Sequence, residues 1–230
     1  KACDGNGRID ECKSINSKDY IEALSKVFRW KVVGSWTKKE SGILLDSAIA
    51  INNRISAITS SEGLGWMYKH FIGISFVHNI SSRKFLKAID FFRSGDGTTP
   101  GIVPFMINSD YRTVLLNDEG INTNTIIHEI GHVLDNNTGS EHFSATWFGG
   151  GAADDLAKFI GVNVSVMDIR WAKSIEGKIP DGYLWSETID KGYGNTTSAD
   201  YFAQTFLYTI TNPSNLPNQD VFSWMLAFIR

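Results

Sequence analysis

The sequence predicts an α+β fold that is mostly helical and contains a small mixed sheet. Several segments place apolar residues three and four apart, as half-buried helices do. Three short segments, residues 71–77, 103–107 and 112–116, are apolar or alternate in polarity and predict strands. The chain has 230 residues, 42% of them hydrophobic, with seven Trp and fourteen Phe. It can therefore bury a substantial core, as one large domain or as two close lobes.

The first fifteen residues are expected to form a small separate segment. Cys3 and Cys12 are the only cysteines in the chain. A bridge between them would close a short loop, as expected of an exported protein, and two free thiols are the alternative.

A calcium site within this segment is a weaker interpretation. Oxygen-bearing side chains alternate between Asp4 and Asp10, as they do in a calcium-binding loop. The usual first acid of such a loop falls on Ala2, however, and the closing glutamate falls on Lys13. A polar turn stapled by the two cysteines is therefore favoured over Ca²⁺.

Residues 16–230 are expected to form the main domain, with lobes at about 16–135 and 136–230. Its apolar spacing predicts helices at residues 18–30, 40–58, 82–92, 152–160, 198–206 and 220–229. Thr197 or Ser198 can cap the start of the helix at 198–206. The strands at 103–107 and 112–116 can form a hairpin or an edge that pairs with a peptide.

A further helix is predicted around residues 128–132, which read H-E-x-x-H. Residues four apart share one face of a helix, so His128 and His132 can present two imidazoles to one metal ion, beside Glu129. Catalytic zinc takes three protein ligands and keeps a position for water, whose proton an adjacent carboxylate can accept. Two surface histidines on an amphipathic helix are the alternative.

The surroundings of the motif favour the helix. Thr123, Asn124 or Thr125 can cap its start. Five apolar residues would bury its opposite side: Ile126, Ile127, Ile130, Val133 and Leu134.

A third zinc ligand is required, and four residues are candidates: Asp135, Glu141, His142 and Asp200. Asp135 shares the face of the histidines but lies about 4.5 Å further along the axis, so it is interpreted as a supporting or helix-end residue. Glu141 and His142 follow a turn and have the character of polar loop residues. Asp200 opens a predicted helix and is the strongest candidate, although an acid there also complements the helix dipole.

Residues 192–206, GYGNTTSADYFAQTF, resemble the closing helix of the anthrax lethal factor-like metallopeptidases, a group that includes the bacterial Pro-Pro endopeptidases. In that pattern a tyrosine is followed by six residues and then by an acidic zinc ligand that opens a helix. Tyr193 and Asp200 have this spacing. Residues 128–135, HEIGHVLD, match the other half of the pattern. The resemblance covers roughly residues 103–206 and implies a zincin-like metallopeptidase fold with an HExxH active-site helix.

The resemblance also implies roles for individual residues. His128, His132 and Asp200 would bind one Zn²⁺, Glu129 would be the general base, and Tyr193 would stabilise the transition state. The family usually has glutamate where this chain has Asp200. Because aspartate is one methylene shorter, its helix must lie closer to the metal, or the ligand must bind with a different geometry.

We therefore expect a secreted, zinc-dependent endopeptidase that hydrolyses protein or peptide substrates and is taken to be a monomer. A catalytically weak or inactive relative that acts as a binding module is the alternative. Asp200 and a possible glycan at Asn195 favour the alternative, whereas Glu129 argues against it. The net charge of −3 without a basic block disfavours nucleic-acid binding, and no apolar run has the length of a membrane span.

Three aromatic or histidine positions have less specific interpretations. Residues 182–185, GYLW, are hypothesised to line the substrate cleft, and packing of Trp185 in the core is the alternative. His70 and His78 lie among apolar residues and are interpreted as structural or surface residues rather than ligands.

Overall fold

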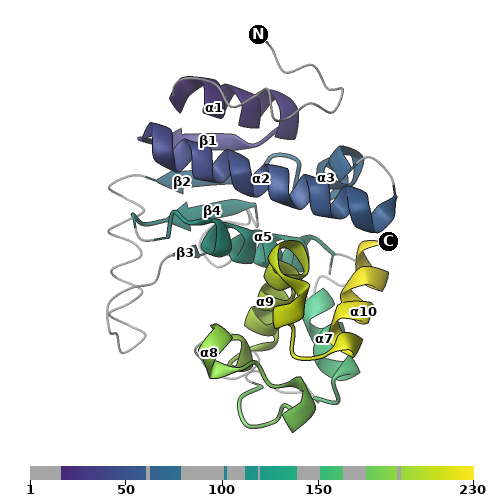
Figure 1. Ribbon diagram of the computed structural model, residues 1–230. Coiled ribbons are helices and arrows are strands. Elements are labelled where there is room, and N and C mark those ends of the chain that lie inside the picture. The colour runs from purple at the N-terminus through teal and green to yellow at the C-terminus, as the bar shows by residue number, and fades with distance from the viewer. Residues whose placement is uncertain are drawn as a thin grey trace. The chain divides into compact units, whose positions relative to one another are not determined.

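The computed structural model describes residues 17–60, 63–78, 101–102, 112–118, 120–138, 151–162, 175–190 and 193–230 (Figure 1). Several predictions lie outside these residues: the Cys3–Cys12 segment with its calcium alternative, the helix at 82–92, the strand at 103–107, and the candidate ligands Glu141 and His142. The chain divides into two compact units, Lys1–Glu129 and Ile130–Arg230. The division falls inside one helix, α5 (Thr123–Thr138).

The first unit contains a mixed sheet of four described strands in the order β1-β2-β4-β3 (Figure 1). The first three, β1 (Lys31–Gly34), β2 (Ser75–His78) and β4 (Thr113–Leu116), are parallel. The outer strand β3 (Gly101–Ile102) pairs antiparallel with β4. Alternate side chains of β2 and β4 are buried, as expected for strands with one face on a core: Phe76, His78, Val114 and Leu116.

Two helices of this unit agree with the predictions. α1 (Ser17–Ala23) continues into a π-helical turn, η2 (Leu24–Phe28), within the predicted helix at 18–30. It ends where Arg29 adopts a left-handed φ of 59°. α2 (Lys38–Thr59) covers the predicted helix at 40–58 and begins with a capping box of Thr37 and Glu40.

Three elements of the first unit were not predicted, and the two-residue strand β3 is one of them. α3 (Gly63–Phe71) occupies the start of the predicted strand at 71–77, so β2 begins only at Ser75. Gly63 and Gly65 lower the helix propensity of α3 and conceal its pattern. β1 is only four residues long, too short to show a clear alternation.

The second unit is helical in its described part (Figure 1). Its elements are α7 (Ala152–Phe159), η3 (Asp181–Tyr183), α8 (Glu187–Asp190), η4 (Tyr193–Asn195), α9 (Ser198–Thr211), η5 (Pro213–Asn215) and α10 (Gln219–Ile229). α7, α9 and α10 confirm the predicted helices at 152–160, 198–206 and 220–229. α9 is buried along almost its whole length and packs against both α7 and α10. It is therefore the central helix of this unit.

The described residues thus confirm the α+β class, with more helix than strand and a small mixed sheet. Among these residues, no helix combines the length and the apolar character needed to cross a membrane.

His70 on α3 generates a prediction about acid stability. Burial, reinforced by the charge of Lys69, lowers the pKa of His70 from 6.5 to about 4. The unfolded chain therefore takes up this proton at a higher pH than the folded chain does. This contribution to stability is present above about pH 6.5 and is lost as the pH falls towards 4.

We predict that His70→Gln makes the free energy of unfolding less sensitive to pH between 6.5 and 4. The variant also loses the ring contact between His70 and Trp66, whose centroids are 4.3 Å apart, but that loss is a constant offset. Urea unfolding of both proteins across this range measures the slope. A difference between them that does not change with pH would contradict the assignment.

Candidate metal centre

Helix α5 carries the H-E-x-x-H motif and begins one residue after its cap. The side-chain Oδ1 of Asn122 accepts a hydrogen bond from the Thr125 N–H at 2.9 Å. The predicted caps, Thr123, Asn124 and Thr125, therefore lie inside the helix rather than before it. The apolar side is fully buried, as the spacing predicts: Ile126, Ile127, Ile130, Val133 and Leu134.

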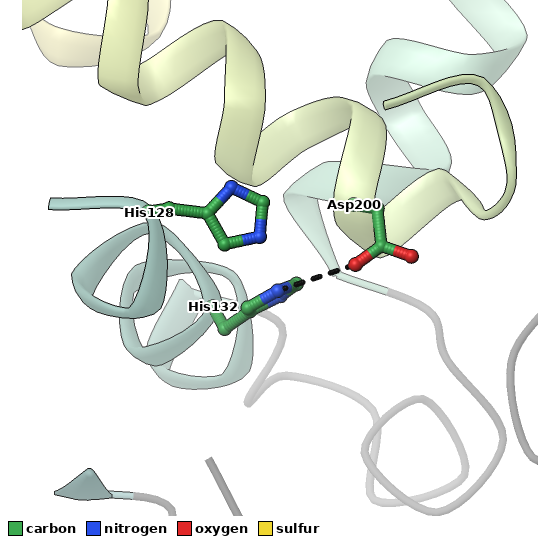
Figure 2. A group of neighbouring side chains, drawn as sticks. All are labelled: His128, His132 and Asp200. Carbon is green, nitrogen blue, oxygen red and sulfur yellow. Dashed lines mark ion pairs between the residues drawn. The ribbon is translucent and has the colours of Figure 1, made fainter. Parts of the chain in front are cut away.

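The two histidines lie on one face of α5, and a carboxylate from α9 approaches them (Figure 2). His128 is 7% exposed and Glu129 is 5% exposed. One potential ligand atom from each of His128, His132 and Asp200 lies within 4.8 Å of the other two. The structure thus brings together the three residues that the sequence suggested as metal ligands.

The separation of two of these atoms fits a tetrahedral ion. Nε2 of His132 and Oδ1 of Asp200 are 3.5 Å apart. That distance is long for an N–H···O hydrogen bond, which is typically about 2.7–3.2 Å. Two atoms that each lie about 2.0–2.2 Å from one tetrahedral zinc ion are about 3.3–3.6 Å apart. The separation of the pair is therefore compatible with two ligands of a single zinc ion as well as with an ion pair.

Asp200 lies in the first turn of α9, where a threonine caps the helix. Thr197 is the N-cap, and its Oγ1 accepts from the Asp200 N–H at 3.0 Å, as one of the two predicted caps. Asp200 is buried, at 9% exposure for the whole residue, and its carboxylate faces α5 (Figure 2).

A close contact between helix backbones accompanies this approach. A Cβ atom added to Gly131 would lie 2.8 Å from the Cα of Ala203. Distances below 3.0 Å are too short for an unstrained contact, so only glycine fits at this position. Gly131 precedes His132, a candidate ligand, and Ala203 is one helical turn from Asp200. The missing side chain thus lets α9 bring a short carboxylate to the histidines.

Asp135 belongs to the end of α5 and not to the ligand group. Its Oδ1 accepts a hydrogen bond from the backbone N–H of Ala153 at 2.8 Å, in the first turn of α7. Burial raises the pKa of Asp135 to about 6, and the bond from Ala153 partly opposes that rise. A Cβ at Gly151 would collide with this carboxylate, so a glycine is required beside it. Asp135 therefore ties α5 to α7.

The position of Tyr193 is described only for its backbone. It opens the short helix η4, a few residues before α9, and its side chain lies outside the described residues.

A second group of possible ligands has a different spacing. Glu40, His78 and Asp118 each offer one atom within 4.8 Å of the others. Nε2 of His78, however, is only 2.7 Å from Oδ1 of Asp118, a hydrogen-bond distance. Nδ1 of the same ring lies 3.0 Å from the carbonyl oxygen of Ser35. We interpret His78, which is 2% exposed, as a buried structural residue, as the sequence suggested.

Trp185 is buried rather than exposed to a cleft. Its side chain is 2% exposed, and its ring centroid is 5.3 Å from that of Tyr208 and 6.0 Å from that of Tyr201, both on α9. The core-packing alternative for Trp185 is therefore the one that the structure supports.

Sequence reasoning assigned no role to Gly131 or Thr196. Oγ1 of Thr196 donates a hydrogen bond to Oδ2 of Asp200 at 3.0 Å. Two threonines precede Ser198 in the sequence, and a helix needs only one residue as its cap. The second threonine was therefore the feature of the sequence that could have indicated a role other than capping.

Comparisons with known proteins do not assign the chain to a family: no family model, no curated protein and no solved structure matches it.

We predict that Gly131→Ala destabilises the protein and weakens zinc binding. The added methyl group must push α9 away, and such overpacking typically costs about 1–3 kcal/mol. Gly65→Ala on α3 is the matched control, since a Cβ there meets nothing within 4 Å. That change should stabilise its helix by about 0.5–1 kcal/mol. Urea unfolding and zinc titration measure both effects, and a Gly131→Ala protein that resembles wild type in both would contradict the contact.

Proposed function

We propose that this chain is a zinc-dependent endopeptidase with a zincin-like fold. The observation that carries the proposal is the grouping of His128, His132 and Asp200, with one pair already at the spacing of tetrahedral ligands. Two imidazoles and one carboxylate form a donor set typical of catalytic zinc, because three protein ligands leave a coordination position for water. Glu129, adjacent to a ligand and buried, makes the group suitable for hydrolysis rather than for structure alone.

Zinc held by these three residues would supply Lewis acidity for the attack of water on a peptide carbonyl. Glu129 would accept the proton of the attacking water and deliver it to the leaving amine. Its burial beside His128 keeps the carboxylate away from bulk solvent. The phenolic hydroxyl of Tyr193 would donate a hydrogen bond to the developing oxyanion. In comparable sites such a donor lowers the activation free energy by about 3–4 kcal/mol.

The resemblance to the lethal factor-like group supports the peptidase class over other hydrolases. It rests on both the histidine motif and the spacing from Tyr193 to Asp200. The mixed sheet before α5 is compatible with this fold, and its outer strand β3 is antiparallel to β4. An exposed strand edge can hold an extended peptide by backbone hydrogen bonds. The part of the proposal that the protein is secreted rests on Cys3 and Cys12 alone.

The binding-module alternative loses one of its arguments. A glycan at Asn195 would crowd the centre, but this amide is already used within the protein. Its Oδ1 accepts from the Trp185 N–H at 2.9 Å, and its Nδ2 donates to the Trp185 carbonyl at 3.0 Å. A glycan attached to Nδ2 would compete with the second bond. The other argument, the shorter acid at position 200, is offset by the close approach of α9 at Gly131.

We predict that wild-type protein binds one zinc ion at this centre and cleaves members of a peptide library, and that a chelator abolishes the cleavage. Glu129→Gln should keep the zinc and lose cleavage by a factor of about 10²–10⁴ or more, because the amide cannot accept the proton. Mass spectrometry of the cleaved library and metal analysis of each protein are the measurements.

Glu40→Gln is the matched control for this test. It makes the same chemical change on α2, where glutamine can keep the capping bond to the Thr37 N–H. Its cleavage rate should equal that of wild type. Cleavage that persists in Glu129→Gln would reject the assignment of the base, and zinc-loaded wild type that cleaves nothing would favour the binding module.

A further inference from the structure

The carboxylate of Asp200 is held by two hydroxyl groups through one of its oxygens. Oγ1 of Thr197 donates to Oδ2 at 2.6 Å, and Oγ1 of Thr196 donates to the same atom at 3.0 Å. The other oxygen, Oδ1, is the one that faces Nε2 of His132. The two oxygens of the carboxylate therefore have different neighbours.

The two hydroxyls differ in whether they also cap the helix. A hydroxyl has one proton to donate and two lone pairs. Oγ1 of Thr197 uses both functions, because it also accepts the Asp200 N–H as the helix cap. Thr196 lies before the cap, and its carbonyl oxygen accepts from the Ile175 N–H at 3.0 Å, which fixes its backbone without the side chain. Loss of the Thr196 hydroxyl should therefore change the carboxylate more than the fold.

We propose that Thr196 and Thr197 are positioning residues that make Asp200 a one-oxygen metal ligand. Two donors on Oδ2 fix the rotation of the carboxylate and draw its charge towards that atom, so Oδ1 alone is presented to the ion. Hydrogen bonds from a hydroxyl to an ionised carboxylate are stronger than neutral ones, and the bond from Thr197, at 2.6 Å, is the shorter of the two. Partners that orient a ligand in this way typically change metal affinity by about 10–100-fold when they are removed.

This arrangement also accounts for the shorter acid. An aspartate carboxylate lies close to its own backbone, within reach of hydroxyls at the preceding helix start. The contact of Gly131 with Ala203 supplies the remaining approach of α9 to the histidines. Orientation by the threonines and proximity from the glycine together replace the reach of a longer side chain. The inference rests on the proposed zinc centre.

The test removes or keeps one hydroxyl at a time. Thr196→Val deletes the hydroxyl and keeps the branched shape, whereas Thr196→Ser keeps the hydroxyl. Thr211→Val is the matched control, because Thr211 lies at the other end of α9 and its hydroxyl donates to the backbone carbonyl of Leu207, away from the ligands. Zinc affinity is measured by competition with a chelator, and coordination geometry by the visible spectrum of the cobalt-substituted protein. Thermal unfolding of the metal-free proteins measures structural damage separately.

We predict that Thr196→Val binds zinc about 10–100-fold more weakly than wild type and has an altered cobalt spectrum. Thr196→Ser and Thr211→Val should match wild type in both measurements, and metal-free Thr196→Val should unfold near the wild-type temperature. Thr197→Ser, which keeps both functions of the cap, should also match wild type, whereas Thr197→Val should lose affinity and stability together.

The possible results distinguish failure of the positioning role from failure of the proposed function. Zinc affinity in Thr196→Val within about twofold of wild type, or a serine variant as weak as the valine variant, overturns the positioning role. Wild-type protein that binds no zinc overturns both this role and the proposed function. Wild type that binds zinc tightly but cleaves no peptide rejects the peptidase alone, and the affinities of the threonine variants still judge the positioning role.

Discussion

The backbone contact between Gly131 and Ala203 sets the separation of α5 and α9, and the distance between the ligands of the candidate metal centre follows from it. Backbones can approach this closely only where side chains are absent or small. The candidate ligand pair His132 and Asp200 lies beside this contact, one residue away on α5 and one helical turn away on α9. The burial of α9 against α7 and α10 keeps it in that position. Packing of apolar side chains thus fixes a distance that the polar residues require.

Distance, rather than residue type, separates the two groups of histidine and acid in the described structure. Both groups contain an imidazole facing a carboxylate. The pair on α5 and α9 is 3.5 Å apart, a separation that is compatible with a shared ion. The pair of His78 and Asp118 is 2.7 Å apart and forms a hydrogen bond. A sequence contains no such information, because both groups join residues that are distant in the chain.

The sequence predicted those parts of the fold that depend on local spacing. The long amphipathic pattern of α2 and the capped start of α9 are examples, since cap and apolar stripe are both written in consecutive residues. α3 was missed because Gly63 and Gly65 lower its helix propensity, although tertiary packing buries Met67 and Phe71. The cap of α5 was misplaced because four neighbouring residues, from Asn122 to Thr125, are all suitable caps, and only the structure identifies Asn122.

The candidate site was predictable in the same partial way. Helix geometry alone placed His128 and His132 on one face, whereas Asp200 required both a helix-start pattern and a family resemblance. The second hydroxyl on Asp200 and the bond from Asp135 to α7 depend on side-chain rotamers and on contacts between distant segments. The burial of Trp185 on α9 was equally beyond a local pattern, because a lone aromatic residue in an irregular segment has no periodicity to interpret.

The Thr197 hydroxyl caps the start of α9 and also orients the carboxylate of a candidate metal ligand, so one atom links helix initiation to the candidate metal centre. An exchange of Asp200 for the glutamate that is usual in the lethal factor-like group would carry the carboxylate past both hydroxyls and further towards the histidines of α5. Aspartate at 200, threonine at 196 and 197, and glycine at 131 therefore form one interdependent set, in which the effect of each substitution depends on the others. In a lineage that made this exchange, the four positions would be expected to change in concert, so that aspartate or glutamate alone is a poor marker of whether a relative has the candidate metal centre.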